Sequence, residues 1–242
     1  MKVIPVIDIL NGIVVHAVRG KRHEYQPLQS ILAQSVKPLE VAQVFKTLGF
    51  RELYIADLDA ITKDQINFQV LKSICEKTGL KLMVDAGVTN LETAEKLIKT
   101  GVSEVVIGTE TLQTKDFVHE AIKLLRDDKI IVSLDLKGEK VLVKLGFKGC
   151  ANPLCLLNEF KDMGISRAIV LDLNRVGTEE GVNVDLLKKV LETGLDVYVG
   201  GGVRDINDLL QLKDLGVCGA LVATALHSGK ISIEKLKQNE LF

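Results

Sequence analysis

The sequence predicts a single (β/α)8 barrel, the TIM-barrel class of α/β fold, and three observations support this prediction. Eight short apolar runs typical of strands alternate along the 242 residues with stretches of helical periodicity. Most of these runs are apolar along their whole length, as expected for a parallel sheet that is buried on both faces. A set of residues also occurs twice along the chain at a constant spacing. A doubly wound open sheet is the alternative to be excluded.

The expected elements alternate regularly along the chain. In order, the expected strands are residues 3–8, 52–57, 81–86, 104–108, 130–135, 167–172, 196–201 and 219–224. The clearest helical stretches are residues 38–49, 91–101, 185–194 and 206–216, and each ends in a glycine, which is favoured where a helix closes. Eight strands in a chain of this length favour a closed barrel.

The internal repeat decides between the barrel and the open sheet. Identical residues recur 115 positions apart without a gap: Pro38 and Pro153, Gly49 and Gly164, Asp57 and Asp172, Gly79 and Gly194, Gly87 and Gly202, Gly101 and Gly216, and Thr109 and Thr224. Asp8 and Asp135 extend the repeat at a spacing of 127. Two related halves, approximately 1–115 and 128–230, bury their open sheet edges by closing on one another. We therefore expect one barrel domain over residues 1–242, built from two half-barrels.

Charge and hydropathy exclude several classes of protein. The formal net charge is −1, so the chain lacks the basic surface that duplex nucleic acid requires. The longest strongly apolar stretch, GVCGALVATAL, is too short to cross a bilayer. Pro5 and Asp8 interrupt the beginning of the chain where a signal peptide needs an apolar core. We expect a cytoplasmic protein that binds neither nucleic acid nor membrane.

The cysteines and histidines lack the spacing of a metal site. Cys75, Cys150, Cys155 and Cys218 form no CxxC pair, and the four histidines are scattered. We therefore expect no bound metal and four free thiols, packed as small apolar groups in a reducing compartment.

Residues suited to chemistry stand where the expected strands end. Active sites of such barrels lie at the carboxyl ends of the strands. The eight residues at these positions are Asp8, Asp57, Asp85, Gly108, Asp135, Asp172, Gly200 and Ala223. The sequence therefore places its candidate functional residues at one end of one barrel.

Two glycine-containing turns predict phosphate sites. The first prediction combines Gly201 and Gly202 with Ala223 and Thr224, whose backbone N–H groups and following short helix would meet an anion. The repeat-related turn, with Gly87, Gly108 and Thr109, predicts a second site across the mouth. Two such sites suggest a ligand with a phosphate at each end. Tight turns that bind nothing are the alternative, particularly at the second site, where Asp85 would repel a phosphate that it faced.

Asp8 and Asp135 form a candidate acid–base pair. They end the first and fifth strands, which lie opposite each other in an eight-stranded barrel. Two carboxyl groups that face one substrate can divide proton transfer, because different environments keep one ionised and the other protonated. The alternative is that each aspartate only caps a loop or binds backbone at the end of its strand.

Five segments resemble the family of ProFAR isomerase and the cyclase of imidazole glycerol phosphate synthase, two activities of histidine biosynthesis. These segments are VIPVIDILNGIVVHAVRG, IVSLDLKGEKVLVKLGF, DLNRVGT, YVGGGVRD and LVATAL, and the resemblance covers essentially the whole chain. It is closer to the isomerase, because Ile7 and His16 stand where the cyclase usually has a cysteine and a lysine. The resemblance implies a ribulose-phosphate-binding barrel that is a monomer or a small homo-oligomer.

The resemblance also implies a reaction and the roles of particular residues. The reaction is an Amadori rearrangement of an aminoaldose phosphate to an aminoketose phosphate, with no metal or organic cofactor. Asp8 matches the general base and Asp135 the general acid. The substrate implied is a phosphoribosyl compound, and its expected further contacts are Arg19, Asp57, Asp172, Gly177 and Thr178.

The chain departs from the isomerase pattern inside the expected site. Leu171 and Val176 replace a threonine and an aspartate, and Asp85-Ala86-Gly87 replaces a triple glycine. The segment RGKRHEYQPLQS after the first strand also differs, and it resembles that of isomerase-related barrels in methanogens and some methylotrophs. Long segments at this face often act as lids, so its cations are candidates to neutralise a phosphate.

Three hypotheses about function follow. The first is an isomerase that acts on the histidine intermediate or on a related phosphoribosyl compound. The second is a related barrel that acts on, or only binds, a different phosphorylated compound, in metabolism linked to tetrahydromethanopterin-type cofactors, and Leu171 and Val176 favour loss of the chemistry. The third is a cyclase-like subunit that needs a glutaminase partner, and Ile7 and His16 argue against it.

Overall fold

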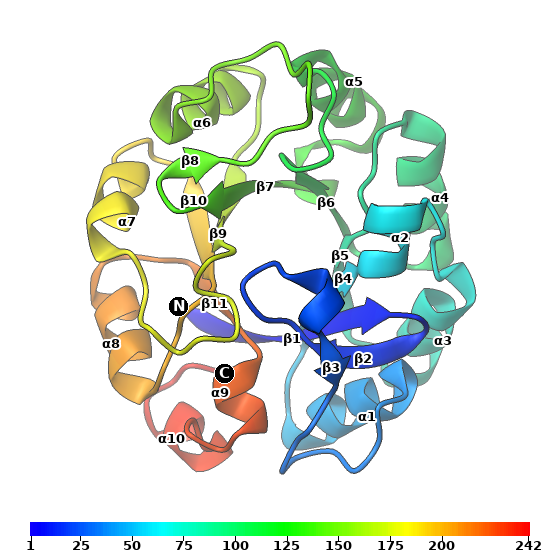
Figure 1. Ribbon diagram of the computed structural model, residues 1–242, viewed down its shortest axis with the longest axis vertical. Coiled ribbons are helices and arrows are strands. Elements are labelled where there is room, and N and C mark those ends of the chain that lie inside the picture. The colour runs from blue at the N-terminus through cyan, green and yellow to red at the C-terminus, as the bar shows by residue number, and fades with distance from the viewer.

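The computed structural model describes residues 1–242 and contains a closed barrel of parallel strands (Figure 1). The barrel strands, in their order around the ring, are β1 (Lys2–Leu10), β4 (Glu52–Asp57), β5 (Lys81–Asp85), β6 (Glu104–Gly108), β7 (Ile130–Lys137), β9 (Arg167–Asp172), β10 (Asp196–Gly200) and β11 (Gly219–Val222). Parallel pairing of β11 with β1 closes the ring. The predicted eight-stranded barrel is therefore confirmed, and the open sheet is excluded.

Helices surround the barrel in Figure 1. The outer helices are α1 (Pro38–Leu48), α3 (Phe68–Thr78), α4 (Leu91–Thr100), α5 (Lys115–Leu125), α6 (Pro153–Asp162), α7 (Val184–Leu191), α8 (Ile206–Asp214) and α10 (Ile233–Gln238). Shorter helices are α2 (Leu58–Lys63), α9 (Thr224–His227) and the 3-10 turns η1 (Arg22–Glu24) and η2 (Asp127–Lys129). Local sequence sets their ends: the side chain of Asn90 accepts the N–H of Thr93 at the start of α4. Gly101 ends the same helix with a φ of 107°.

The element bounds reproduce the spacing of the sequence repeat. β9 begins and ends 115 residues after β4, and β10 begins and ends 115 residues after β5. Pro38 and Pro153 each occupy the first position of their helix, where proline is tolerated because no N–H is needed there. We infer from this agreement that the two halves are related, as the repeat predicts.

Two of the barrel strands carry antiparallel extensions. β2 (Ile13–His16) and β3 (Gln26–Pro27) extend β1, and β8 (Lys140–Val141) pairs with the end of β7. In Figure 1 the dark-blue segment of residues 17–25 and the yellow segment of residues 173–182 both lie in front of the ring. These connections place polar side chains above the barrel.

The core has two layers that the strands separate. Inside the barrel, 11 buried residues form one cluster, including Tyr54 and Ala56. Between the strands and the outer helices, 55 buried residues form the other, including Leu53 and Ile55. Successive side chains of a strand therefore alternate between the two layers. At the carboxyl ends this alternation decides which side chains face the barrel mouth.

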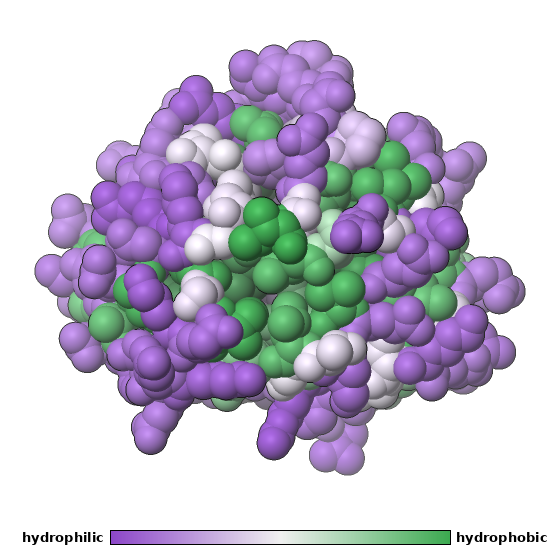
Figure 2. All heavy atoms as spheres, turned by 90° about the horizontal axis from the view of Figure 1, so that it is seen from below, coloured by the Kyte–Doolittle hydropathy of each residue, from purple (hydrophilic) through white to green (hydrophobic).

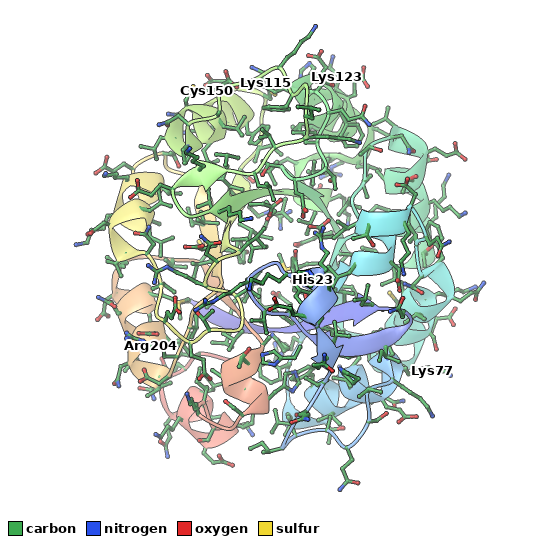
Figure 3. The ribbon with its side chains drawn as sticks, in the orientation of Figure 1. His23, Lys77, Lys115, Lys123, Cys150 and Arg204 are labelled. Carbon is green, nitrogen blue, oxygen red and sulfur yellow. A yellow bond between two sulfur atoms is a disulfide. The ribbon has the colours of Figure 1, made fainter.

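The expectation of four free thiols is wrong for two of the cysteines. Cys150 and Cys155 form a disulfide just before and within α6, near the top of Figure 3, where Cys150 is labelled. Their Cα atoms are 6.0 Å apart, and between them the side chain of Asn152 caps the helix by accepting the N–H groups of Leu154 and Cys155. Cys75 and Cys218 are free thiols, as expected.

The outer surface is mostly polar. Figure 2, which views the molecule from the lower edge of Figure 1, shows a hydrophobic area in the middle of that face with hydrophilic residues around it. Ile31, in the connection between β3 and α1, is 72% exposed. No helix combines the length and the apolar character needed to cross a membrane.

Candidate active site

A cavity of about 350 Å³ opens at the carboxyl ends of the barrel strands. Eight of the residues predicted from the sequence line it: Asp8, Arg19, Asp135, Gly177, Gly201, Gly202, Ala223 and Thr224. Six others do not line it: Asp57, Gly87, Gly108, Thr109, Asp172 and Thr178. The two groups differ mainly in the direction that each side chain or N–H group takes from its strand.

Asp8 presents a free carboxyl group to this cavity. It follows Ile4 and Val6 on the inward side of β1, so its side chain faces the barrel mouth. No protein group donates a hydrogen bond to it, and burial alone raises its pKa to about 7. The group can therefore exchange a proton near neutral pH, as a general acid or base must.

Asp135 faces the same cavity from the opposite strand, β7, but it is held by hydrogen bonds. The Ser133 hydroxyl donates to Asp135 Oδ1 over 2.7 Å, and the Glu110 N–H donates to Oδ2 over 3.0 Å. Burial raises the pKa of Asp135, and these two hydrogen bonds oppose the rise because they stabilise the ionised form. The carboxyl group is thus fixed in orientation.

Asp85 adds a third carboxyl group; the sequence placed it at the end of a strand but assigned it no role in catalysis or in binding. It ends β5 and lines the cavity, and its Oδ1 accepts the N–H of Gly87 over 3.0 Å. Burial and the nearby charge of Asp135 raise its pKa. The signal in the sequence was its position at the end of a strand.

Gly108 lies between Asp85 and Asp135 rather than at a phosphate. A Cβ atom there would stand 2.9 Å from Asp135 Oδ2 and 3.2 Å from Asp85 Oδ2. The missing side chain therefore makes room for the two carboxyl groups. The space at Gly108 is thus used by carboxyl groups, whereas the sequence predicted a phosphate contact there.

The turn at Gly201 and Gly202 supplies free backbone donors. The N–H groups of both glycines and of Ala223 donate to no acceptor in the protein. The glycines have φ values of 91° and 93°, and a Cβ would lie 2.4 Å from the carbonyl oxygen of Asp172 and 2.2 Å from that of Gly181. Close backbone packing therefore requires glycine here, and it leaves several N–H groups available to an anion.

The repeat-related turn offers fewer free donors than the turn at Gly201 and Gly202. The Gly87 N–H is bound to Asp85, and the Thr109 N–H donates to the carbonyl oxygen of Ser133 over 2.9 Å. Thr109 is fully buried, and its hydroxyl accepts the N–H of Asp135 over 3.0 Å. Gly87 and Thr109 therefore support the carboxyl groups of the site.

Asp57 and Asp172 end their strands pointing away from the mouth. Asp57 lies on the outward side of β4, where it accepts the N–H groups of Ala60 and Asn67. Asp172 accepts the N–H of Asn174 and pairs with Arg175 over 3.1 Å. Thr178 donates its hydroxyl to the carbonyl oxygen of Arg175. The structure gives these three residues, which the sequence predicted to contact the substrate, roles in turns.

Connections from three strands meet over the cavity. Arg22, after β1, pairs with Glu110, after β6, over 2.6 Å, and Arg19 pairs with Glu180, after β9, over 2.5 Å. The Arg19 N–H also donates to the carbonyl oxygen of Val176. In Figure 3, His23 of the same segment is labelled near the centre of the barrel, and its side chain is 81% exposed.

The wall beside the turn at Gly201 and Gly202 is apolar. Leu171 and Val176 both line the cavity. A Cβ on Gly200 would lie 2.8 Å from Leu171 Cδ1, so this side chain fills the space above β10. Arg204 lies near this turn but is bound to Asp208 over 2.6 Å and stands at the periphery in Figure 3.

A second cavity of about 480 Å³ adjoins the first and shares Asp8, Ala223 and Thr224 with it. His16 Nε2 lies 3.1 Å from the Thr224 hydroxyl. Ala223 and Thr224 therefore border open space on the side that faces β2. No set of three or more histidine, cysteine or acidic side chains is arranged to hold a metal ion.

A family model described as histidine biosynthesis protein matches residues 2–232. The chain belongs to this family. The match spans nearly the whole barrel, including both acid-bearing strands and the turn at Gly201 and Gly202. The resemblance found in the sequence is therefore confirmed at the level of the family.

Individual relatives in the histidine biosynthesis family include proteins with and without a named activity. The chain is 38% identical over 240 residues to a protein of Methanocaldococcus jannaschii named only as uncharacterized protein MJ0703, covering 98% of this chain and 97% of that one. It is 33% identical to an isomerase of Clostridium acetobutylicum, with 97% of each chain covered, and 34% identical to one of Pelagibacter ubique, with 98% of each covered. Both isomerases are named for 1-(5-phosphoribosyl)-5-((5-phosphoribosylamino)methylideneamino)imidazole-4-carboxamide, the compound abbreviated ProFAR.

Proposed function

We propose that this member of the histidine biosynthesis family is an aldose–ketose isomerase that catalyses an Amadori rearrangement of a phosphorylated aminoaldose. The observation that carries the proposal is the placement of Asp8 and Asp135 on opposite strands of one cavity whose wall also offers free backbone N–H groups. The two named isomerases support the reaction class.

The phosphate of the substrate binds at the turn of Gly201 and Gly202. The free N–H groups there and at Ala223 donate to its oxygens, as oriented backbone dipoles do at other anion sites. This contact fixes one end of the sugar. The reacting carbons then lie over the barrel between β1 and β7.

Asp135 acts as the acid that opens the sugar ring. It donates a proton to the ring oxygen, the bond between that oxygen and C1 breaks, and the nitrogen lone pair forms a protonated imine at C1. The neighbouring Asp85 favours this role, because two adjacent buried carboxyl groups resist losing both protons. The pair thus retains a proton at a higher pH than an isolated carboxyl group would.

Asp8 acts as the base in the second step. It removes the proton from C2, and the electrons of that bond move through C1 to the nitrogen and give an enolamine. Protonation at C1 and loss of the hydroxyl proton at C2 then yield the aminoketose. Asp8 suits this step because no hydrogen bond restrains its carboxylate and its pKa of about 7 makes it a stronger base than an exposed aspartate.

The substrate differs from ProFAR in the part that meets Leu171 and Val176. These side chains offer no hydrogen bond, and a ligand whose polar groups lose their partners is rejected strongly. We therefore propose weak or undetectable turnover of ProFAR, with retained binding of phosphoribosyl compounds. A barrel that only binds its ligand is the second candidate, and the same two residues favour it.

Complementation of a histidine auxotroph that lacks the isomerase tests the proposal, together with an assay of the purified protein on ProFAR. We expect poor or no growth, slow isomerisation, and loss of that activity in Asp8→Asn. Vigorous growth would contradict the changed substrate. Growth or turnover that survives in Asp8→Asn would contradict the mechanism.

A further inference from the structure

The two ends of the cavity differ in charge. Free N–H groups of Gly201, Gly202 and Ala223 mark the side of β10 and β11, whereas Asp85 marks the side of β5, which is four strands from β10 and three from β11 around the ring. We propose that the substrate is a monophosphate ester whose opposite end carries an amine or another cationic, proton-donating group received by Asp85. This inference rests on the proposed function only for the choice of this cavity as the substrate site.

A phosphate at the β5 end would meet an unfavourable charge and fewer free donors. Of the N–H groups that correspond to those of Gly201 and Gly202, that of Gly87 donates to Asp85, whereas that of Ala86 has no acceptor in the protein; the Thr109 N–H donates to Ser133. The carboxyl group of Asp85 stands in the cavity wall and would repel an anion. The sequence repeat has therefore produced two unlike ends from related turns.

Asp85 itself lacks one partner. Its side chain belongs to a residue only 7% exposed, and the single hydrogen bond to it, from Gly87, uses Oδ1. Oδ2 accepts no donor from the protein and lies toward Gly108, whose missing Cβ leaves space there. Arg22, the arginine at this side of the mouth, is engaged by Glu110. A ligand that brings its own positive charge completes the environment of Asp85.

The recognition expected is a charge-assisted hydrogen bond in a partly desolvated site. Such bonds are shorter and stronger than neutral ones. A neutral hydroxyl group in the same place would gain less. Two ligands that differ only in having an amine or a hydroxyl group at this end should therefore differ in affinity.

Isothermal calorimetry with three series of simple ligands tests the proposed preference for a cationic group at Asp85. The probes are ω-aminoalkyl phosphates of two to six carbons, ω-hydroxyalkyl phosphates of the same lengths as neutral controls, and alkanediyl bisphosphates. Because the alkyl chains have several lengths, one of them can match the distance between the turn at Gly201 and Gly202 and the carboxyl group of Asp85. At the best length we expect the aminoalkyl phosphate to bind at least about tenfold more tightly than the hydroxyalkyl phosphate.

Variants assign the preference to Asp85. In Asp85→Asn, which keeps the size of the side chain, the amine and hydroxyl ligands should bind within about twofold of each other. The matched control Asp116→Asn, on the exposed surface of α5, should keep the preference. Asp85→Gly removes both the charge and the bulk of the side chain. It should therefore raise the affinity for bisphosphates. Circular dichroism confirms that each variant is folded.

Several results would overturn the inference. Tightest binding of the bisphosphates by the unaltered protein would show a second anion site, for which Lys137 at the cavity rim is the available cation. An amine preference that persists in Asp85→Asn, or failure of all three series to bind, would also contradict it. Asp8→Asn separates the two proposals, because it should abolish isomerisation and leave the amine preference unchanged.

Discussion

Arg22 and Glu110 form an ion pair of 2.6 Å that joins the segment after β1 to the segment after β6 above the cavity. The two side chains are 31% and 27% exposed, so the pair is only partly shielded from solvent. It closes the mouth on the side of Asp85, and the pair of Arg19 with Glu180 closes the side of β9. The segment of residues 17–25 thus connects to both halves of the barrel.

Replacing Arg19 and Arg22 together by alanine should weaken ligand binding several-fold. Each ion pair at such exposure is worth about 0.2–1 kcal/mol, so the expected loss is modest. Calorimetric titration with ribose 5-phosphate measures this loss of affinity. Lys144→Ala, at an exposed position outside the cavity, serves as the control. Unchanged affinity in the double variant would leave the segment without a part in binding.

Asp8→Asn and Asp135→Asn should each abolish isomerisation and leave the protein folded. Single acid–base groups contribute about 10²–10⁴ in rate, so the losses are measurable wherever the unaltered protein shows turnover. Asp196→Asn, at the far end of β10, is a matched control that should keep full activity. Full activity in either Asp8→Asn or Asp135→Asn would rule out the acid–base pair.

The pKa of Asp8 predicts a dependence of stability on pH. Burial raises this pKa from 3.8 to about 7, so the folded protein holds the proton more tightly than the unfolded chain. The contribution that the raised pKa of Asp8 makes to the free energy of unfolding is therefore complete below about pH 4, and it is lost as the pH rises through 7. Asp8→Asn, which stays neutral, should have a higher free energy of unfolding than the unaltered protein at pH 8, by on the order of 2 kcal/mol, because one pKa unit corresponds to about 1.4 kcal/mol and the carboxyl group faces an open cavity.

Urea unfolding at pH 4, 6 and 8 measures this difference. At pH 4 the two proteins should agree closely, since Asp8 is then protonated in the folded state. Asp85 and Asp135 titrate in both proteins, so their contributions largely cancel in the comparison. A difference that does not change with pH would show that Asp8 is ionised as readily as in water.

Crystals grown with phosphate or sulfate should show one anion, at Gly201, Gly202 and Ala223. The free N–H groups there define the position, and the occupied N–H groups of Gly87 and Thr109 make the repeat-related turn the weaker anion site. Anion density at Gly87 with none at Gly202 would reverse this assignment. Calorimetry with inorganic phosphate gives an independent measure of the number of sites, which we expect to be one.

The sequence by itself determined the barrel and much of the site. Its eight apolar runs and the 115-residue repeat predicted every barrel strand to within a few residues, because burial on both faces makes such strands continuously apolar. The carboxyl ends of parallel strands must meet at one end of the barrel. Asp8, Asp135, Gly201 and Gly202 therefore lie around one cavity, as the sequence predicted.

The tertiary structure alone decided the direction of each side chain and the use of each N–H group. A strand that is apolar at every position carries no alternation that shows which residues point inward, so Asp57 and Asp172 could not be separated from Asp8 and Asp135 in the sequence. The strands place Asp57 among turn N–H groups and Asp85 in the cavity. Likewise, the two related turns differ in how many free N–H groups they offer, because neighbouring oxygens accept more of these groups in one turn than in the other, and that depends on packing between strands rather than on the turn itself.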